Sequence, residues 1–152
     1  RRLSELAVFR AVELDKDGQI APIRIGAHSN IQDGVVIHTK SGAPVTIGER
    51  TSIAHRAIVH GPCSVGHDVF IGFNSVLFNC TIGDGCVVRY NAVVDGCELP
   101  PGFYVPSTER IGPDTAIASL KPVSIDATAF SDDVARTNNA LVRGYQSIQH
   151  EF

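Results

Sequence analysis

The sequence predicts a mainly β fold, a parallel β-helix of hexapeptide repeats that is followed by a C-terminal α-helix. Three observations lead to this fold class. An aliphatic residue returns about every six residues, the six-residue units group into coils of nearly constant length, and the pattern near the C-terminus changes to a helical period. We expect a single domain over residues 1–152, with the β-helix over about 7–112 and the helix over about 131–149.

The hexapeptide repeat starts with "IGAHSN" at Ile25 and continues to "VPSTER" at Val105. A period of six does not suit an α-helix, whose period is 3.6, but it is typical of a β-helix in which three short strands form one triangular coil. The aliphatic residues that open the units should point inward and stack from coil to coil. They are Ile25, Ile31, Ile37, Ile47, Ile53, Val59, Val65, Ile71, Leu77, Ile82, Val88, Val94, Leu99 and Val105.

The distance between equivalent units supports coils of about eighteen residues. Successive coils open at Ile47, Val65, Ile82 and Leu99, and these intervals are nearly equal. The preceding interval, from Ile25 to Ile47, is distinctly longer. We therefore expect an inserted loop at Thr39–Pro44, whose Gly and Pro residues suit turns.

Three of the four cysteines follow the coil period. Cys63, Cys80 and Cys97 are separated by equal intervals of one coil, which predicts a ladder at a corner that requires a small side chain. The sequence contains no C-x-x-C pair, so we expect neither a zinc site of the ribbon type nor a redox role. A reducing compartment fits this cysteine usage.

Composition and charge exclude two classes of partner. The net charge is −3 and there is no block of Lys and Arg, so we expect no nucleic-acid partner. No apolar run approaches the ~20 residues of a membrane span, and the N-terminus lacks the apolar segment of a signal peptide. The expected location is cytoplasmic.

The segment near the C-terminus has the pattern of an amphipathic helix. Ser131 or Asp132 is a suitable N-cap. We expect the helix to pack along the outside of the prism or against a neighbouring subunit. Its expected apolar face consists of Val134, Leu141, Val142, Tyr145 and Ile148.

Three histidines suggest a metal site. His38 and His60 occupy equivalent positions in successive coils, so their side chains should stack about one strand spacing, ~4.8 Å, apart. His55 occupies another position of the repeat and should diverge from His60. A three-fold trimer would allow His55 of one chain to join His38 and His60 of the next, giving a His₃ zinc site with an open fourth position. The alternative is that they are surface residues, as we expect for His28 and His67.

At these residues the sequence resembles a known family. The segments "NIQDGVVIH", "IAHRAIVHGP" and "VGHDVFIGFNSVLFN" resemble the γ-class carbonic anhydrases, and most closely the carbonic-anhydrase-like domain of carboxysome assembly proteins. The resemblance covers roughly Ile23 to Pro106, with a weaker echo in "NNALVRGYQ". It implies a left-handed β-helix, although the crossover rule by itself favours the right hand. It also implies a homotrimer with metal at the subunit interfaces.

The resemblance also implies roles for individual residues. His38, His55 and His60 match the zinc ligands, and iron or cobalt would suit the same ligands. Gln32 matches a glutamine that hydrogen-bonds the attacking water or hydroxide. The other matched residues are Asp33 in the site's polar network, Arg10 at the interface, Glu13 as a carboxylate that orients water or takes its proton, and Phe73 and Phe78 beside the CO₂ site.

The implied function is reversible hydration of CO₂ to bicarbonate by a zinc-dependent enzyme. The loop "HTKSGAP" departs from the family because it has no carboxylate where the family has an acidic loop after the first ligand. Val12 stands where the family has an aspartate near the arginine, so we expect a weaker intersubunit salt bridge than in the family.

Two other classes of function stay open. One is a scaffold domain with weak or no activity that assembles with carboxysome proteins, which would place the chain inside a carboxysome. The other is a hexapeptide acyltransferase, which would share the prism but usually needs only one catalytic histidine. The presence of three histidines with Gln32 and Asp33 argues against the acyltransferase.

Overall fold

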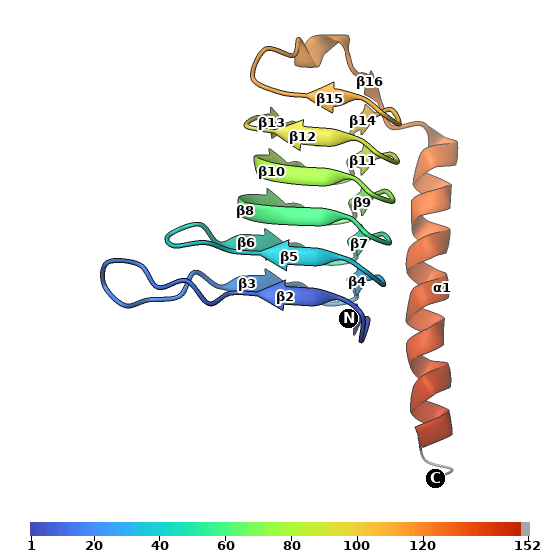
Figure 1. Cartoon of the computed structure of the whole chain (residues 1–152). Helices are drawn as coiled ribbons and strands as arrows, with labels where there is room; N and C mark the ends of the chain where they lie inside the picture. The colour runs from blue at the N-terminus through green and yellow to red at the C-terminus, as the bar shows by residue number, and fades with distance from the viewer. Residues whose placement is uncertain (150–152) are drawn as a thin grey trace.

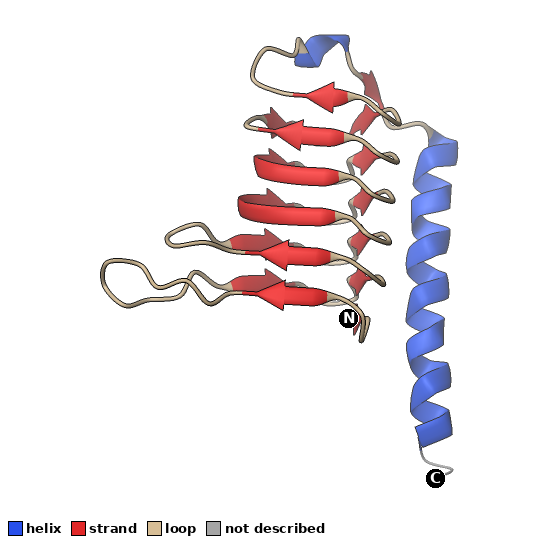
Figure 2. Cartoon of the chain, in the orientation of Figure 1, coloured by secondary structure: helices blue, strands red, loops and turns tan. Residues whose placement is uncertain are grey.

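The computed structural model describes residues 1–149, except for the side chains of residues 138–139 and 141–149. It is a three-sided prism of parallel strands with one long helix along its side (Figures 1 and 2). The first face is covered by the helix, α1 (Ile125–Gln149). Its parallel strands are β1 (Arg2–Leu3), β4 (Asn30–Ile31), β7 (Ser52–Ile53), β9 (Phe70–Ile71), β11 (Val87–Val88) and β14 (Phe103–Val105), and β16 (Lys121–Pro122) pairs antiparallel with β14.

The other two faces share the long strands β8 (Ile58–Val65) and β10 (Val76–Ile82). The second face adds β2 (Val8–Arg10), β5 (Val36–His38), β12 (Val93–Asp95) and β15 (Arg110–Ile111). The third adds β3 (Ile23–Ile25), β6 (Val45–Ile47) and β13 (Glu98–Leu99).

The winding of the chain is left-handed. As the chain rises in Figure 1, it crosses the front to the left along β2 and β5 and returns behind to the right along β3 and β6. Seen from the top of the prism, the chain therefore turns clockwise as it approaches the observer. This is the sense of a left-handed coil. The predicted fold class, a left-handed β-helix with a C-terminal helix, is confirmed.

The core is the stack of aliphatic residues that open the repeats. Every predicted opening residue except Ile25 is at most 2% exposed, and Ile25 lies half-buried in the first coil. Outward neighbours on each strand stay accessible because side chains alternate along a strand. Thr39–Pro44 joins β5 to β6 as the predicted loop, and a longer hairpin at residues 11–22 joins β2 to β3.

The cysteine ladder is part of this core. Cys63 and Cys80 are paired in register, and their Sγ atoms lie 3.7 Å apart. The hydrogen bond to Cys63 and the burial of the thiol both raise the pKa of Cys80. Thr81 pairs with Glu98, which puts Cys97 next in the same row. A packed row of small side chains fits the predicted structural role.

Helix α1 begins at Ile125, well before the predicted start at 131. The N-cap is Ser124 rather than Ser131 or Asp132, because the Ser124 hydroxyl accepts a hydrogen bond from the Ala127 amide at 3.2 Å. The helix packs along the outside of the prism, which is one of the two predicted arrangements. Val134 of the helix contacts the prism. The other predicted apolar residues, Leu141, Val142, Tyr145 and Ile148, lie outside the described side chains.

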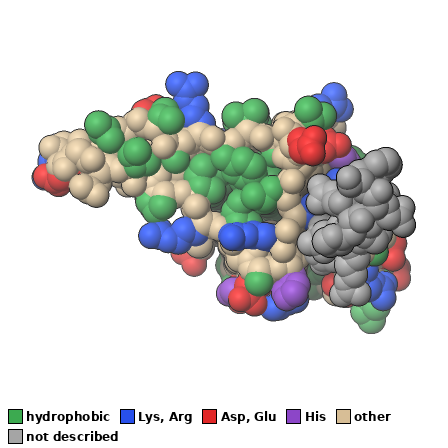
Figure 3. Space-filling model, turned by 90° about the horizontal axis from the view of Figure 1, so that it is seen from below, with side chains coloured by type: hydrophobic (Ala, Val, Ile, Leu, Met, Phe, Trp, Pro, Cys, Tyr) green, Lys and Arg blue, Asp and Glu red, His purple; other side chains and the backbone are tan. Residues whose placement is uncertain are grey.

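The prism also begins earlier than the predicted residue 7. Arg2 and Leu3 form β1, which pairs with Asn30 and Ile31 of β4. This end of the prism leaves Leu3, Leu6, Val8 and Phe9 between 38% and 71% exposed. Viewed from this end, Figure 3 shows hydrophobic side chains gathered at its centre.

Candidate metal site

Strand register places four of the predicted site residues in one row on the second face. Arg10 pairs with His38, His38 with His60, and His60 with Phe78. The rings of His38 and His60 have centroids 4.8 Å apart at an angle of 79°. Equal coil positions therefore become direct neighbours on adjacent strands, because the inserted loop at 39–44 leaves the strand register unchanged.

The nitrogen atoms of these two histidines are suited to binding a cation. His60 Nδ1 lies 2.8 Å from the Gly61 carbonyl, to which it donates a hydrogen bond in the neutral tautomer that leaves Nε2 free as a lone-pair donor. His38 Nε2 is buried and has no hydrogen-bond partner among the described residues. Because an unpaired buried nitrogen is costly, a ligand at this position would offset its desolvation.

Glu13 reaches this row from the hairpin at residues 11–22. Its Oε1 lies 3.5 Å from His38 Nε2, an ion-pair contact and not a hydrogen bond. The hairpin is fastened at its base, where the Thr39 hydroxyl donates to the Ala21 carbonyl at 2.8 Å. A carboxylate is therefore placed beside the histidine pair, 48% exposed at the edge of the second face.

The third histidine lies in a separate cluster. His55 is in the turn between β7 and β8, where its ring stacks on Phe73 with centroids 5.7 Å apart. Gln32 occupies the equivalent turn one coil below; it is 4% exposed, and its Oε1 has no hydrogen-bond partner among the described atoms. A cavity of about 210 Å³ opens between this corner and α1, with Gln32, His55 and Phe73 in its wall.

The remaining predicted residues divide between the two clusters. Phe78 packs on His60 with ring centroids 5.2 Å apart, whereas Phe73 belongs to the His55 corner. Asp33 follows Gln32 in its turn and accepts a hydrogen bond from the Ser4 hydroxyl. The two predicted walls of the CO₂ site therefore lie on different sides of one chain.

One chain alone does not assemble three metal ligands. Among residues 1–149, no three His, Cys, Asp or Glu side chains come close enough together to hold a metal ion. The chain carries two partial sites instead, His38 with His60 on the second face and His55 at the corner near α1. A second copy of the chain would be needed to combine them.

Between these clusters runs an aliphatic row that the sequence did not single out. Strand register aligns Val8, Val36, Ile58, Val76 and Val93 along the second face. These are outward positions, and Ile58 is 40% exposed. The sequence could have identified this row, because four of its residues immediately precede a residue that opens a repeat. The fifth, Val8, precedes Phe9, which pairs with the opening residue Ile37.

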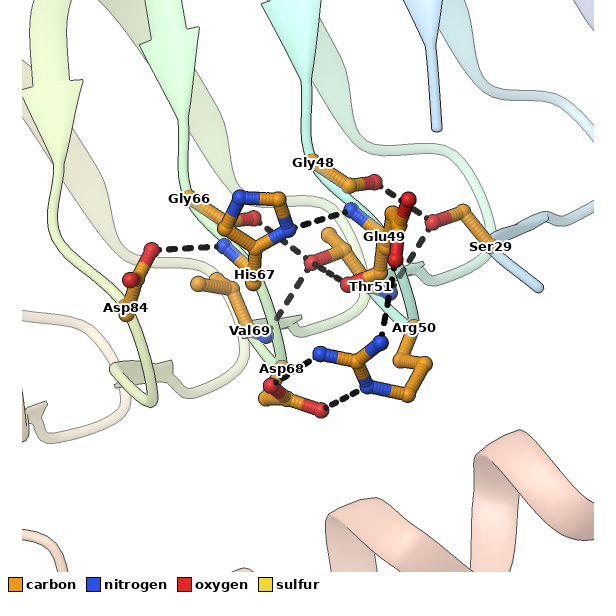
Figure 4. A network of polar contacts seen from close by, with 10 residues as sticks. All are labelled: Ser29, Gly48, Glu49, Arg50, Thr51, Gly66, His67, Asp68, Val69 and Asp84. Carbon is orange, nitrogen blue, oxygen red and sulfur yellow. Dashed lines mark hydrogen bonds and ion pairs between the residues drawn. The ribbon is translucent and has the colours of Figure 1, made fainter. Parts of the chain in front are cut away.

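His28 and His67 lie outside both clusters, at another corner of the prism; His28 lines a cavity there with Arg50 and Asp68, and Figure 4 shows the contacts of His67. His67 Nδ1 accepts a hydrogen bond from the Glu49 amide at 3.0 Å, and both His28 and His67 are exposed. Beside them Arg50 donates to Asp68 at 2.7 and 2.9 Å, which holds the pKa of Asp68 below its usual value. This corner is a network of structural polar contacts, in agreement with the surface role expected for these histidines.

The chain is similar in sequence to several known proteins. Residues 44–79 match the family model described as bacterial transferase hexapeptide (six repeats). The chain is 39% identical over 134 residues to the carboxysome assembly protein CcmM of a Nostoc species, an alignment that covers 82% of this chain. It is 33% identical over 147 residues to a carbonic anhydrase of Methanosarcina thermophila, again covering 82% of this chain. The chain belongs to the hexapeptide-repeat family. Within that family it is homologous to CcmM and to the γ-class carbonic anhydrases over most of its length.

These relatives are longer than the chain. It spans 24% of the Nostoc CcmM and 59% of the Methanosarcina carbonic anhydrase. Among solved structures, a hexapeptide transferase family protein from Anaplasma phagocytophilum superposes with a TM-score of 0.65 at 20% identity, over 93% of this chain and 90% of that one. That likeness concerns the fold. Among the described helices, none is both long and apolar enough to cross a bilayer.

The sequence by itself did not point to three residues near the candidate site. Tyr90 continues the corner stack, since its ring is nearly parallel to Phe73 with centroids 4.8 Å apart. The sequence could have identified Tyr90, because it lies one coil after Phe73. Asp133 and Thr137 of α1 line the corner cavity, and no sequence periodicity relates the helix to that corner.

Proposed function

We propose that the chain is the subunit of a γ-class carbonic anhydrase, a homotrimer that reversibly hydrates CO₂ at metal sites shared between subunits. The observation that carries the proposal is the division of the ligands. His38 presents a buried Nε2 without a hydrogen bond beside His60, while His55 stands apart at another corner. Homology to proteins named carbonic anhydrase supports the same reaction.

The proposed metal ligands are His38 and His60 of one subunit and the partner's His55. Three neutral imidazoles suit zinc, and they would also accept iron or cobalt. When bound, such a metal lowers the pKa of water to about 7 and so supplies a nucleophile at neutral pH. The buried His38 Nε2, which makes no hydrogen bond and lies beside the Glu13 carboxylate, is the feature of this chain that fits a cation best.

The neighbouring side chains would position the reactants. The unpartnered Gln32 Oε1 is an acceptor that can orient the attacking water, and Glu13 beside His38 can hold that water from the other side. Phe73 and Phe78, each about two-fifths exposed in the single chain, would supply an apolar surface for a nonpolar gas. We assign Arg10 and Asp33 to the polar network that joins the subunits around the site.

The aliphatic row on the second face supports the proposed trimer. Val8, Ile58 and their neighbours in the row lie on the same face as His38 and His60, and α1 covers a different face. Burying this row against a neighbouring subunit would remove apolar surface from water at about 25 cal/mol per Å². The same contact would bring a second chain to the histidine pair.

Mixed trimers test the shared site directly. We expect the His38→Ala and His55→Ala proteins each to form trimers that bind no metal. Co-folding the two variants should restore metal, because an interface that joins an intact His38–His60 pair to an intact His55 then exists. Each mixed trimer contains one such interface, so metal content measured by mass spectrometry should approach one ion per mixed trimer. Failure of mixing to restore metal would contradict a site shared between chains.

A scaffold role is the second candidate, and one observation favours it. The loop Thr39–Pro44 beside the histidine pair carries no carboxylate, and the homologues include carboxysome assembly proteins. In that case the trimer would be a building block for carboxysome proteins with weak or no activity. Stoichiometric metal together with CO₂ hydration by the purified trimer would favour the enzyme, and metal without hydration would favour the scaffold.

A further inference from the structure

The cavity between α1 and the His55 corner joins a buried polar atom to the solvent. Its prism wall contains Gln32 and His55, and its helix wall contains Asp133 and Thr137. Gln32 is 4% exposed with an unpartnered Oε1, whereas the Asp133 side chain is 73% exposed. The cavity volume of about 210 Å³ is large enough for several water molecules, whose share of liquid volume is roughly 30 Å³ each.

Asp133 is the only carboxylate among the residues that line this cavity in the described part of the chain. Its contact with Arg136 is an exposed pair within the helix at 3.6 Å, and such pairs are weak enough to leave the carboxylate available to other partners. The loop Thr39–Pro44 beside the histidine pair contains no carboxylate. The tertiary packing of α1 therefore brings a carboxylate to the site from the far end of the sequence.

We infer that Asp133 accepts the proton that CO₂ hydration releases and passes it to the solvent. This inference rests on the proposed function. In each turnover one O–H bond of the attacking water breaks and its electron pair stays on the oxygen. That oxygen bonds to the carbon of CO₂ while one C=O π pair moves onto oxygen, which gives bicarbonate. The proton leaves through water in the cavity to an Asp133 oxygen. Bulk buffer then takes the proton, so the carboxylate is regenerated and no oxidant or reductant is needed.

The adjacent residue provides a matched control. Asp132 carries the same charge on the same helix turn, but it lines a different cavity, next to Arg50 and Asp68. Asp133→Asn should therefore remove the proton acceptor. Asp132→Asn should remove an equal charge without changing the cavity through which the proton leaves. Both substitutions are at exposed positions, so both proteins should fold and bind metal as the parent protein does.

The experiment compares these variants and Glu13→Gln as metal-loaded full chains. Asp133→Asn should lower kcat about tenfold or more at low buffer concentration, leave kcat/KM unchanged, and regain kcat on addition of imidazole. Asp133→Asn should bind as much metal as the parent protein. Its cobalt-substituted form should also keep the pH midpoint of the visible spectrum. A residue with only a structural role would change one or both of these quantities when substituted. Asp132→Asn should match the parent in kcat as well.

Four results would overturn the inference. These are an unchanged kcat in Asp133→Asn, an equal loss in Asp132→Asn, a shifted spectral midpoint, or the buffer-rescued pattern appearing in Glu13→Gln and not in Asp133→Asn. If the parent protein is active and any of these results is found, only the role of Asp133 is contradicted and the proposed function stands. A metal-loaded parent protein that hydrates no CO₂ overturns the proposed function together with this inference.

Discussion

At the scale of single residues, the coils approach one another so closely at one corner that a side chain is excluded. A Cβ atom added to Gly48 would lie 2.5 Å from the Gly66 carbonyl oxygen, and one added to Gly26 would lie 2.6 Å from the Gly48 carbonyl. Both contacts involve backbone, which cannot move without shifting a whole coil. The glycine that follows an opening aliphatic residue is therefore required by the stacking distance, not by backbone conformation.

We expect Gly48→Ala to lower the free energy of unfolding by more than about 2 kcal/mol, a large effect for a single substitution, because backbone must separate to admit the methyl group. Gly42→Ala is the contrast. Gly42 has φ +67° and no atom within 4 Å of its added Cβ, so only left-handed strain of about 1 kcal/mol should result. Chemical denaturation measures both, and an equal loss in the two variants would count against the close approach.

At the scale of elements, α1 is held to the first face by an aromatic contact near its start. The ring of Phe130 meets Phe70 edge to face with centroids 5.5 Å apart, and the Arg89 guanidinium lies 5.5 Å from the centre of the same ring. Since Phe70 is 1% exposed, Phe130 covers a core side chain. This contact fixes where the helix lies, and with it the position of Asp133 in the next turn.

Phe130→Ala should destabilise the protein by about 1–3 kcal/mol, less than the ~3–5 kcal/mol of a fully buried phenylalanine, because Phe130 is 39% exposed. Amide hydrogen exchange should rise in α1 while the strands of the prism stay protected. Ile125→Ala is the matched control, since Ile125 is 88% exposed at the start of the same helix and should change neither quantity. Loss of protection throughout the prism would show that the helix is not a separate unit.

At the scale of the whole molecule, the three faces differ in what covers them. Helix α1 covers the first, the second presents the aliphatic row beside His38 and His60, and the third carries small polar side chains such as Thr46, Ser64 and Thr81. Apolar contact between subunits therefore suits the second face. A trimer formed through it would bury the row and bring a neighbouring chain to the histidines.

If the proposed trimer forms through this face, Ile58→Asp should convert it into monomers and prevent metal binding, because a buried, unpaired carboxylate costs several kcal/mol at each interface. Ser64→Asp introduces the same charge further along the same strand, β8, but on the third face, and should leave the oligomer intact. Sedimentation velocity and metal analysis report both effects. Dissociation by Ser64→Asp instead would place the interface on the third face.

The sequence alone determined the prism, its core and its inserted loop. Each coil repeats one local rule, an inward aliphatic residue about every six positions, so spacing predicts which residues stack, as it did for Cys63 and Cys80. The same arithmetic predicted that His38 and His60 are neighbours. Only the tertiary structure decided where α1 starts and lies, and hence that Asp133 faces the cavity of Gln32 and His55. The physical reason is that this contact joins segments far apart in the sequence through packing on Phe70, and no repeat connects them.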